Sequence, residues 1–220
     1  MSERPAAERR EDLIALMREM QSRHECPLIA TRTKLVFGAG NADADLLFVG
    51  EAPGFYEDQQ GLPFVGRAGK LLDQLLIEIG LDRQAAFVTN VLKCRPPDNR
   101  DPAPDEIEIC KPYLLRQIQL IEPKVVCTLG NFSLKLLTRS NTGITRVHGV
   151  PQEHELGGRV VQLYPLYHPA AALRGTAVLE QLREDFSRLP DLIAAQEPVP
   201  QPEPAPEPQP DPASQMDLFG

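Results

Sequence analysis

The sequence contains no long hydrophobic run. Among its 220 residues, no apolar stretch approaches the about 20 residues that a helix needs to cross a bilayer. The N-terminal segment, MSERPAAERREDLIALM, is charged and lacks the apolar stretch of a secretory signal. These absences argue against a membrane or secreted protein, so we expect a cytoplasmic protein without a membrane partner. The content of 42% hydrophobic and 25% charged residues is typical of a globular protein.

Cysteine is scarce, with four in the chain. A cytoplasmic protein is not expected to use them for structural disulfides. Cys127 lies in the apolar stretch VVCTL and is expected to pack as a small hydrophobic residue. Cys26, Cys94 and Cys110 lie in three different settings, and their spacing alone is weak evidence for a metal site.

Lysine and arginine are absent after Arg188. Six acidic residues follow that position and carry −6 of the formal net charge of −8, which leaves −2 for the rest: Asp191, Glu197, Glu203, Glu207, Asp211 and Asp217. A strongly acidic protein is normally a poor partner for nucleic acid. Because the excess is confined to the C-terminal part, the nearly balanced body does not exclude such a partner.

Proline occupies every second position from Pro198 to Pro212. Proline fixes φ and lacks an N–H, so this stretch can form neither a helix nor a sheet. We expect a semi-rigid spacer that rises about 3.1 Å per residue. The chain is thus predicted to comprise an N-terminal helix in 1–24, a globular domain in 25–195, a disordered, acidic, proline-rich linker in 196–213 and a terminal peptide in 214–220.

Apolar spacing in the body predicts alternating helices and strands. Strands are predicted at 45–49, 86–89, 124–129 and 160–167, and helices at 6–21, 68–79, 104–120, from 132 onward, and over 176–195 with a break at Pro190. Such alternation is typical of an α/β fold whose mainly parallel sheet is covered on both faces.

Four polar side chains follow the predicted strands: Glu51, Asn90, Asn131 and His168. In an open parallel sheet the ligand crevice lies beyond the carboxyl ends of the strands, so these residues are expected to share one rim. Asn131 has an alternative role as the cap of the helix that follows it. The His-Pro pair after the last strand has an alternative interpretation as a plain turn.

Five motifs resemble the family 4 uracil-DNA glycosylases, the iron–sulfur members of their superfamily. They are GEAPGFYED (50–58), GLPFVGRAGKLLD (61–73), TNVLKCRPPDNRDP (89–102), C-x-PYL from Cys110, and YHPAAALR (167–174). The resemblance extends from about Cys26 to Leu189 and implies a three-layer α/β/α sandwich around a four-stranded, mainly parallel sheet. It identifies 25–195 as a uracil-DNA glycosylase domain.

The resemblance implies a role for each matched residue. Glu51 belongs to the first catalytic motif, beside the substrate-binding Gly50 and Ala52, and His168 belongs to the second. Phe64 would stack on the extruded uracil, Asn90 would pair with its edge, and Glu57 would exclude the methyl group of thymine. Leu173 and Arg174 would lie in the loop that presses into the DNA duplex.

These residue types suit hydrolysis of the N-glycosidic bond, which leaves an abasic site. The enzyme must flip the nucleotide out of the stack, and an aromatic ring then replaces the lost stacking, worth about 1–3 kcal/mol. An Asn amide matches both the O4 acceptor and the N3–H donor of uracil. His168 would donate to uracil O2 as negative charge develops there.

Glu51 has three alternative roles, which are orienting water, activating water and stabilising the cationic sugar. Asn99 is a secondary candidate for positioning water. No lysine stands among the strand-end residues, so we expect no lyase step. Two other functions stay open: a relative that acts on other deaminated bases, and a non-catalytic DNA-binding module.

The family's iron–sulfur cluster has four cysteine ligands, the first two as C-x-x-C. Here Cys26, Cys94 and Cys110 match three of them, but Arg23 stands at the first position. His24 is the nearest substitute, since histidine ligates some iron–sulfur centres. The alternatives are a three-iron cluster, a 4Fe-4S cluster with a non-protein ligand, and no cluster. We predict a 4Fe-4S cluster with an incomplete or altered ligand set.

The chain ends in SQMDLFG, which places large apolar residues at the end of the predicted spacer. The Q-x-D-L-F pattern resembles the peptide that bacterial repair proteins insert into the DNA polymerase sliding clamp. That resemblance implies that Gln215 binds a polar pocket, while Met216, Leu218 and Phe219 anchor in an apolar one. We therefore expect two partners, uracil-containing DNA and the sliding clamp, and a monomeric protein.

Overall fold

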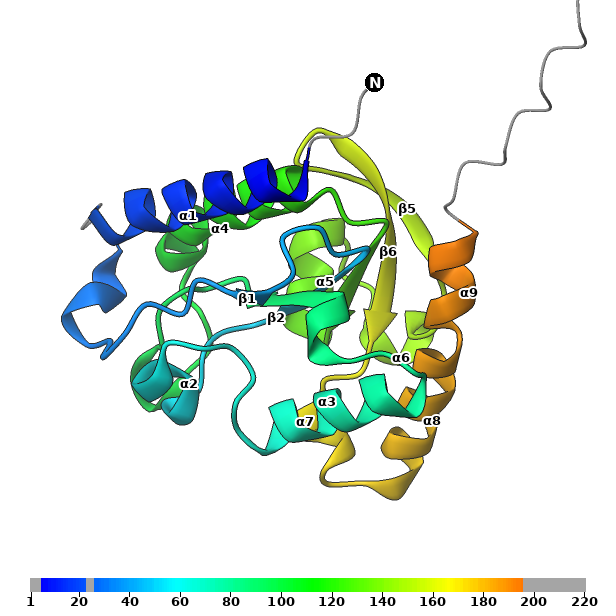
Figure 1. Cartoon of the computed structure of the whole chain (residues 1–220). Coiled ribbons are helices and arrows are strands. Elements are labelled where there is room, and N and C mark those ends of the chain that lie inside the picture. Colours follow the sequence, from blue (N-terminus) through cyan, green and yellow to red (C-terminus); the bar gives the residue numbers. More distant parts are fainter. Residues whose placement is uncertain (1–4, 23–25, 196–220) are drawn as a thin grey trace, which may run out of the picture.

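The computed structural model describes residues 5–22 and 26–195 (Figure 1). Arg23, His24, the linker 196–213 and the terminal peptide with Gln215, Leu218 and Phe219 lie outside the described residues. Within the described part, no helix combines the length and the apolar character that crossing a membrane requires.

A mixed sheet in the order β1-β3-β2-β4-β6-β5 forms the middle layer of the described residues. Its central four strands are parallel, as predicted: β3 (Ala86–Asn90), β2 (Leu46–Gly50), β4 (Val125–Leu129) and β6 (Arg159–Leu166). The antiparallel edge strands β1 (Ala39–Gly40) and β5 (Gln152–Leu156) are additional to the four-stranded prediction. The α/β class is confirmed.

The central strands are buried on both faces because their side chains alternate between two cores. In β2, Leu47 and Val49 belong to one core, and Leu46 and Phe48 belong to the other. Each core needs its own layer of helices.

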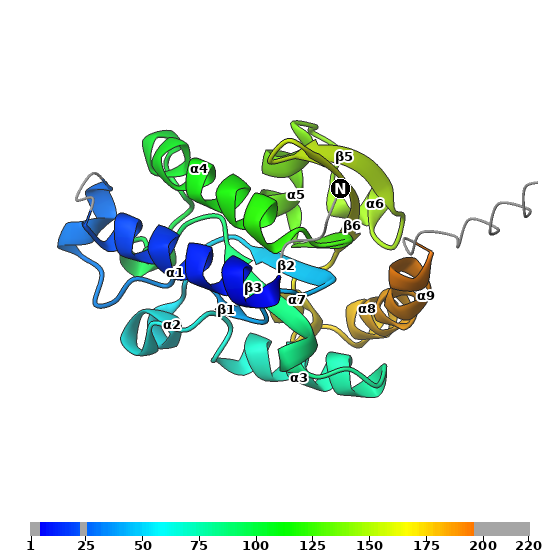
Figure 2. The same ribbon diagram turned by 45° about the horizontal axis from the view of Figure 1, so that its top comes forward.

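The first core is covered by α1 (Ala6–Ser22), α4 (Pro104–Ile121) and α5 (Asn131–Thr138). The second is covered by α3 (Arg67–Glu78), α8 (Thr176–Ser187) and α9 (Leu189–Ala194). Figure 2 shows α1 and α4 on one side of the sheet, and α3 and α8 on the other. Two short helices, α2 (Phe55–Gln60) and α7 (Pro169–Ala172), follow β2 and β6 at their carboxyl ends.

Candidate active site

The carboxyl ends of the parallel strands open into a cavity of about 380 Å³. It gathers six residues that the sequence analysis singled out, from five separate segments: Glu51, Ala52, Glu57, Phe64, Asn90 and His168. Asn99 also lines it, from the loop that follows β3. Glu51, Asn90 and His168, which lie at the carboxyl ends of three of the parallel strands, thus line one shared cavity.

Gly50 lies directly behind the cavity wall and is paired with Asn90 in the register of β2 and β3. A Cβ atom on Gly50 would lie 2.3 Å from Asn90 Oδ1 and 2.8 Å from two ring carbons of Phe64. The amide of Asn90 and the ring of Phe64 therefore meet over a position where only glycine fits. Asn90 is almost fully buried, with 2% of its surface exposed.

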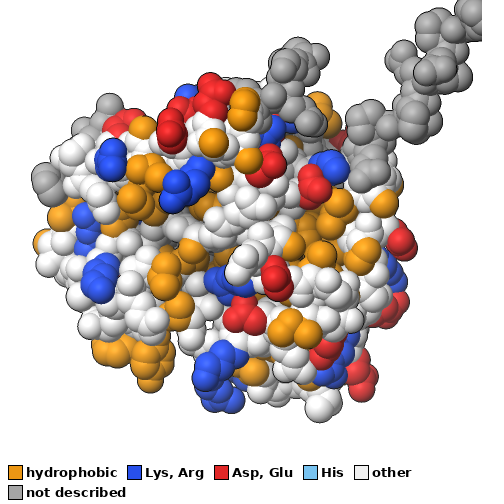
Figure 3. Space-filling model, in the orientation of Figure 1, with side chains coloured by type: hydrophobic (Ala, Val, Ile, Leu, Met, Phe, Trp, Pro, Cys, Tyr) orange, Lys and Arg blue, Asp and Glu red, His pale blue; other side chains and the backbone are white. Residues whose placement is uncertain are grey.

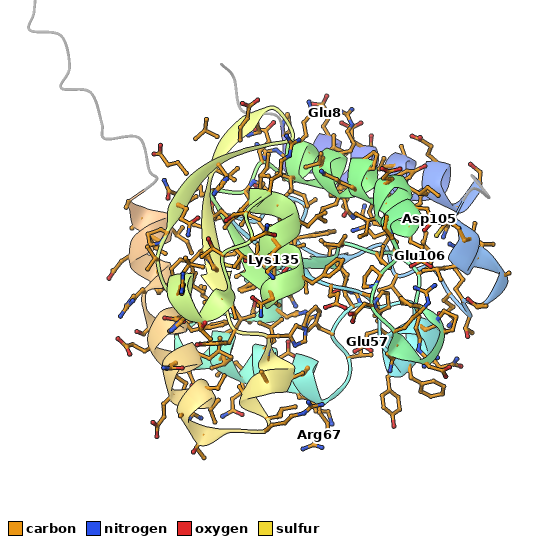
Figure 4. The ribbon with its side chains drawn as sticks, turned by 180° about the vertical axis from the view of Figure 1, so that it is seen from behind. Glu8, Glu57, Arg67, Asp105, Glu106 and Lys135 are labelled. Atoms are coloured by element: carbon orange, nitrogen blue, oxygen red, sulfur yellow. The ribbon has the colours of Figure 1, made fainter. Side chains whose placement is uncertain are left out.

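Phe64 occupies a strained backbone conformation with φ 53°. The surrounding loop is fixed by two charged side chains. Glu57 Oε1 accepts hydrogen bonds from the amides of Val65 and Gly66, both at 3.0 Å. From the other side, Arg83 donates to the carbonyl of Pro63 at 2.6 Å. Glu57, a residue of α2 (Figure 4), therefore orients the loop that carries Phe64 and also lines the cavity.

The tautomer of His168 follows from its position at the start of α7. Its Nδ1 accepts a hydrogen bond from the amide of Ala170 at 3.1 Å, so in the neutral ring the proton resides on Nε2. Burial lowers the pKa of His168 to about 4, against an opposing effect of the Glu57 charge. The imidazole is thus a neutral donor near pH 7, and its ring stacks 5.7 Å from that of Phe64.

Glu51 lies between two hollows. Besides the main cavity, it lines an adjoining one of about 420 Å³ together with Asp101, Asn131, Lys135 and His168. Burial and, to a lesser extent, the charge of Asp101 raise the pKa of Glu51. The sequence analysis expected no lysine among the strand-end residues. Lys135, on α5 in Figure 4, nevertheless lines this adjoining hollow together with Glu51 and His168.

Asn131 does not cap its own helix through its side chain. Its Oδ1 accepts a hydrogen bond from the amide of Ile144 at 2.8 Å, which ties α5 to the start of α6 (Ile144–Val147). Leu173 and Arg174 are exposed and follow α7, which begins beside His168. They line a separate hollow against α3 and α8, so the structure does not bring them into the main cavity.

Lys93 is a buried residue that the sequence analysis missed. Its Nζ donates to Thr89 Oγ1 at 2.6 Å, the carbonyl of Asn90 at 2.7 Å and Gln117 Oε1 at 2.6 Å. Three acceptors match the three N–H groups of an ammonium ion, although burial lowers the pKa of Lys93 to about 7. Lys93 thereby fixes the backbone at Asn90 from behind. Its place in the apolar-flanked motif TNVLKC was the only sequence signal for its burial.

Cys26, Cys94 and Cys110 converge behind this network. Cys26 hydrogen-bonds to both other thiols; these bonds, the one with Cys110 foremost, lower the pKa of Cys26 to about 3 and raise those of Cys94 and Cys110. Arg32 also donates to Cys94 Sγ at 3.2 Å. Cys127 lies in the other core, as expected for a packing residue.

These three thiols fit an iron–sulfur cluster in chemistry, because such clusters are held by cysteine sulfur. They supply three of the four ligands that the family uses. In the part of the chain that the structure describes, no group of three or more His, Cys, Asp or Glu side chains is arranged to hold a metal ion. The position that would match a first ligand, and its neighbour His24, fall outside the described residues.

The fold and the cavity define a member of the uracil-DNA glycosylase superfamily, whose family model matches residues 37–188. The chain is 45% identical over 192 residues to a type-4 uracil-DNA glycosylase of Archaeoglobus fulgidus, covering 86% of this chain and 96% of that protein. It is also 45% identical over 187 residues to one of Sulfurisphaera tokodaii (83% and 85% covered), and 44% identical over 167 residues to one of Thermotoga maritima (75% and 85% covered). The chain belongs to the type-4 uracil-DNA glycosylases.

Proposed function

We propose that this protein removes uracil from DNA by hydrolysing the N-glycosidic bond of a flipped-out deoxyuridine. The observation that carries the proposal is the meeting of Asn90, Phe64 and His168 in one cavity that also holds Glu51. Asn90 would read the edge of the base, Phe64 would stack on it, and His168 would donate a hydrogen bond to it. Hydrolysis of a flipped-out nucleotide needs all three.

Each role has physical support. The buried amide of Asn90 can satisfy both O4 and N3–H of uracil, whereas cytosine would leave buried groups unpaired. The neutral His168 can donate through Nε2 to uracil O2 as charge develops there. Glu51 lines the same cavity, where it would hold water or stabilise the cationic sugar, and its burial raises its pKa.

The deciding experiment uses single-stranded and duplex oligonucleotides that carry one U, T or hypoxanthine, followed by alkaline strand cleavage. We expect cleavage at U only. Cleavage at hypoxanthine would favour a relative with broader substrates, and DNA binding without cleavage would leave a binding module. Borohydride trapping should give no covalent adduct, because the expected step is hydrolysis; an adduct lost in Lys135→Met would instead identify a lyase.

We further propose that Cys26, Cys94 and Cys110 hold a 4Fe-4S cluster. Their convergence and the Arg32 hydrogen bond support it. When bound, the cluster would cross-link the loop after β3 to α4 and to the segment after α1; no step of the hydrolysis depends on it here. Protein purified without oxygen should contain iron and sulfide and absorb visible light, and Cys94→Ser should lose both while Cys127→Ser keeps them. A folded, colourless, iron-free wild-type protein would exclude the cluster.

We propose a clamp-binding role for the terminal peptide, resting on its sequence. A peptide of residues 210–220 should bind the sliding clamp weakly, and Leu218→Ala with Phe219→Ala should abolish binding. Excision from free oligonucleotides should not change in that double variant. Tethering would raise the local concentration of a monomeric enzyme at newly copied DNA. Full-length protein that fails to associate with the clamp would leave the tail as a spacer.

A further inference from the structure

Two large aromatic side chains lie exposed on α2, immediately beside the cavity. Phe55 is 51% exposed and Tyr56 is 62% exposed, and their rings meet edge to face with centroids 5.5 Å apart. They stand between Gly54 and Glu57, which both line the cavity. Figure 3 shows the corresponding hydrophobic patch at the lower left, over α2. Leaving two such rings in water forfeits a large gain from burial, which indicates that the patch meets a partner.

An arginine completes this patch. The guanidinium of Arg95 lies 5.4 Å from the centroid of the Phe55 ring, a cation–π arrangement. Its Nε donates to Asn99 Oδ1 at 2.7 Å, and Asn99 itself lines the cavity. The patch is therefore continuous with the cavity wall through both α2 and the loop after β3.

We propose that Phe55, Tyr56 and Arg95 form a stacking platform for an unpaired base next to the flipped nucleotide. The proposal rests on the proposed function, since DNA must enter the cavity for a neighbouring base to reach the platform. Every base has an aromatic face, so exposed rings bind unpaired bases with little sequence preference. Arg95 adds a positive charge that suits the adjoining phosphate. An apolar protein partner would offer no negative group to the Arg95 guanidinium beside Phe55.

The absence of tryptophan from the whole chain makes a direct test available. Phe55→Trp introduces a single fluorophore, whose emission an overlying base should quench. The probes are two single-stranded oligonucleotides that both carry a base-free tetrahydrofuran nucleotide at the target position. One has thymines on either side of it, and the other has further tetrahydrofuran nucleotides there. The matched control is Val160→Trp, at a 71% exposed position near the start of β6, away from the rim.

We expect Phe55→Trp to be quenched by the thymine-flanked probe and not by the base-free probe, while Val160→Trp responds to neither. Phe55→Ala combined with Tyr56→Ala should raise KM for uracil excision about tenfold, which is about 1.4 kcal/mol. The double variant should lose substrate affinity, seen in KM, and keep its kcat. Phe55→Tyr alone, which keeps an aromatic ring at this position, should have the KM of the wild-type protein. Equal emission with both probes together with an unchanged KM would overturn the platform.

Two further outcomes are distinguishable. Emission of Phe55→Trp that changes with protein concentration in the absence of DNA would assign the patch to a second copy of the chain, and would overturn the proposal. Wild-type protein that excises no uracil would refute the proposed function instead, since the quenching experiment measures binding without excision.

Discussion

Replacing Gly50 with alanine would insert a methyl group where the base-reading residues meet. The added Cβ would lie 2.3 Å from Asn90 Oδ1, whereas ordinary contacts begin at 3.4 Å, so the amide must retreat by about 1 Å. The Phe64 ring, 2.8 Å from the same position, must also shift. A misplacement of about 1 Å costs about 10²-fold in rate. We therefore expect kcat/KM for uracil excision to fall about 100-fold, which is about 2.7 kcal/mol of lost transition-state stabilisation.

The assay is single-turnover excision from a uracil oligonucleotide, with alkaline cleavage as the readout. Overpacking of this kind also destabilises by about 1–3 kcal/mol, so a thermal melt must first show that the variant is folded. Gly143→Ala is the matched control, because the nearest atom to its added Cβ lies 3.8 Å away. A folded Gly50→Ala protein that excises uracil at the wild-type rate would refute the packing argument.

Four further predictions concern Asn90, His168 and Lys93. Asn90→Asp presents an acceptor to uracil O4, so uracil excision should fall and cytosine excision can emerge; undiminished uracil preference in the oligonucleotide assay would show that Asn90 does not read the edge. His168→Ala should lower the rate by about 10²–10³-fold. Because burial lowers the pKa of His168 to about 4, its ring should stay neutral from pH 8 down to about pH 4. The unfolded chain binds this proton already near the ordinary histidine pKa, so folding stability should fall as the pH drops from about 6.5 toward 4. An NMR titration midpoint near the ordinary value of about 6.5 would contradict this. Lys93→Met should lower the free energy of unfolding by about 1–3 kcal/mol, since it removes three buried hydrogen bonds. A urea melt no different from that of the exposed Lys70→Met would show that these hydrogen bonds do not stabilise the protein.

Periodicity and strand ends were enough to predict the central sheet and the cavity. The four parallel strands are strongly apolar, and parallel strands must bring their carboxyl ends to one rim, so Glu51, Asn90 and His168 could be placed together from order alone. The edge strand β1 has only two residues, too few to show any alternation. Strand β5 has the polar and charged sequence QEHEL, which lacks the apolar residues by which the other strands were predicted.

The missed parts of the site depend on contacts between segments distant in sequence. Lys93 bonds to Gln117 across 24 positions, and its apolar neighbours in TNVLKC could not reveal that distant partner. Glu57 was predicted to lie near the base. Its hydrogen bonds to the amides of Val65 and Gly66 could not be predicted, because they depend on how the loop with Phe64 folds back onto α2. Leu173 and Arg174 were predicted to press into the DNA duplex, which stays a prediction; they follow α7 and line a hollow against α3 and α8.

The shortness of β1 has a consequence for how the protein opens. On its outer edge β3 is covered by only two residue pairs, Ala39 with Val88 and Gly40 with Phe87, whereas its inner edge pairs along all five residues with β2. Local opening starts where few bonds must break, so β1 should separate at a lower free energy than the seam between β2 and β4. Hydrogen exchange should then reach the outer amides of β3 first. This edge of the sheet can thus fray while the five-residue ladder that joins β3, with the base reader Asn90 at its end, to β2 stays closed, so opening at β1 does not reach the cavity.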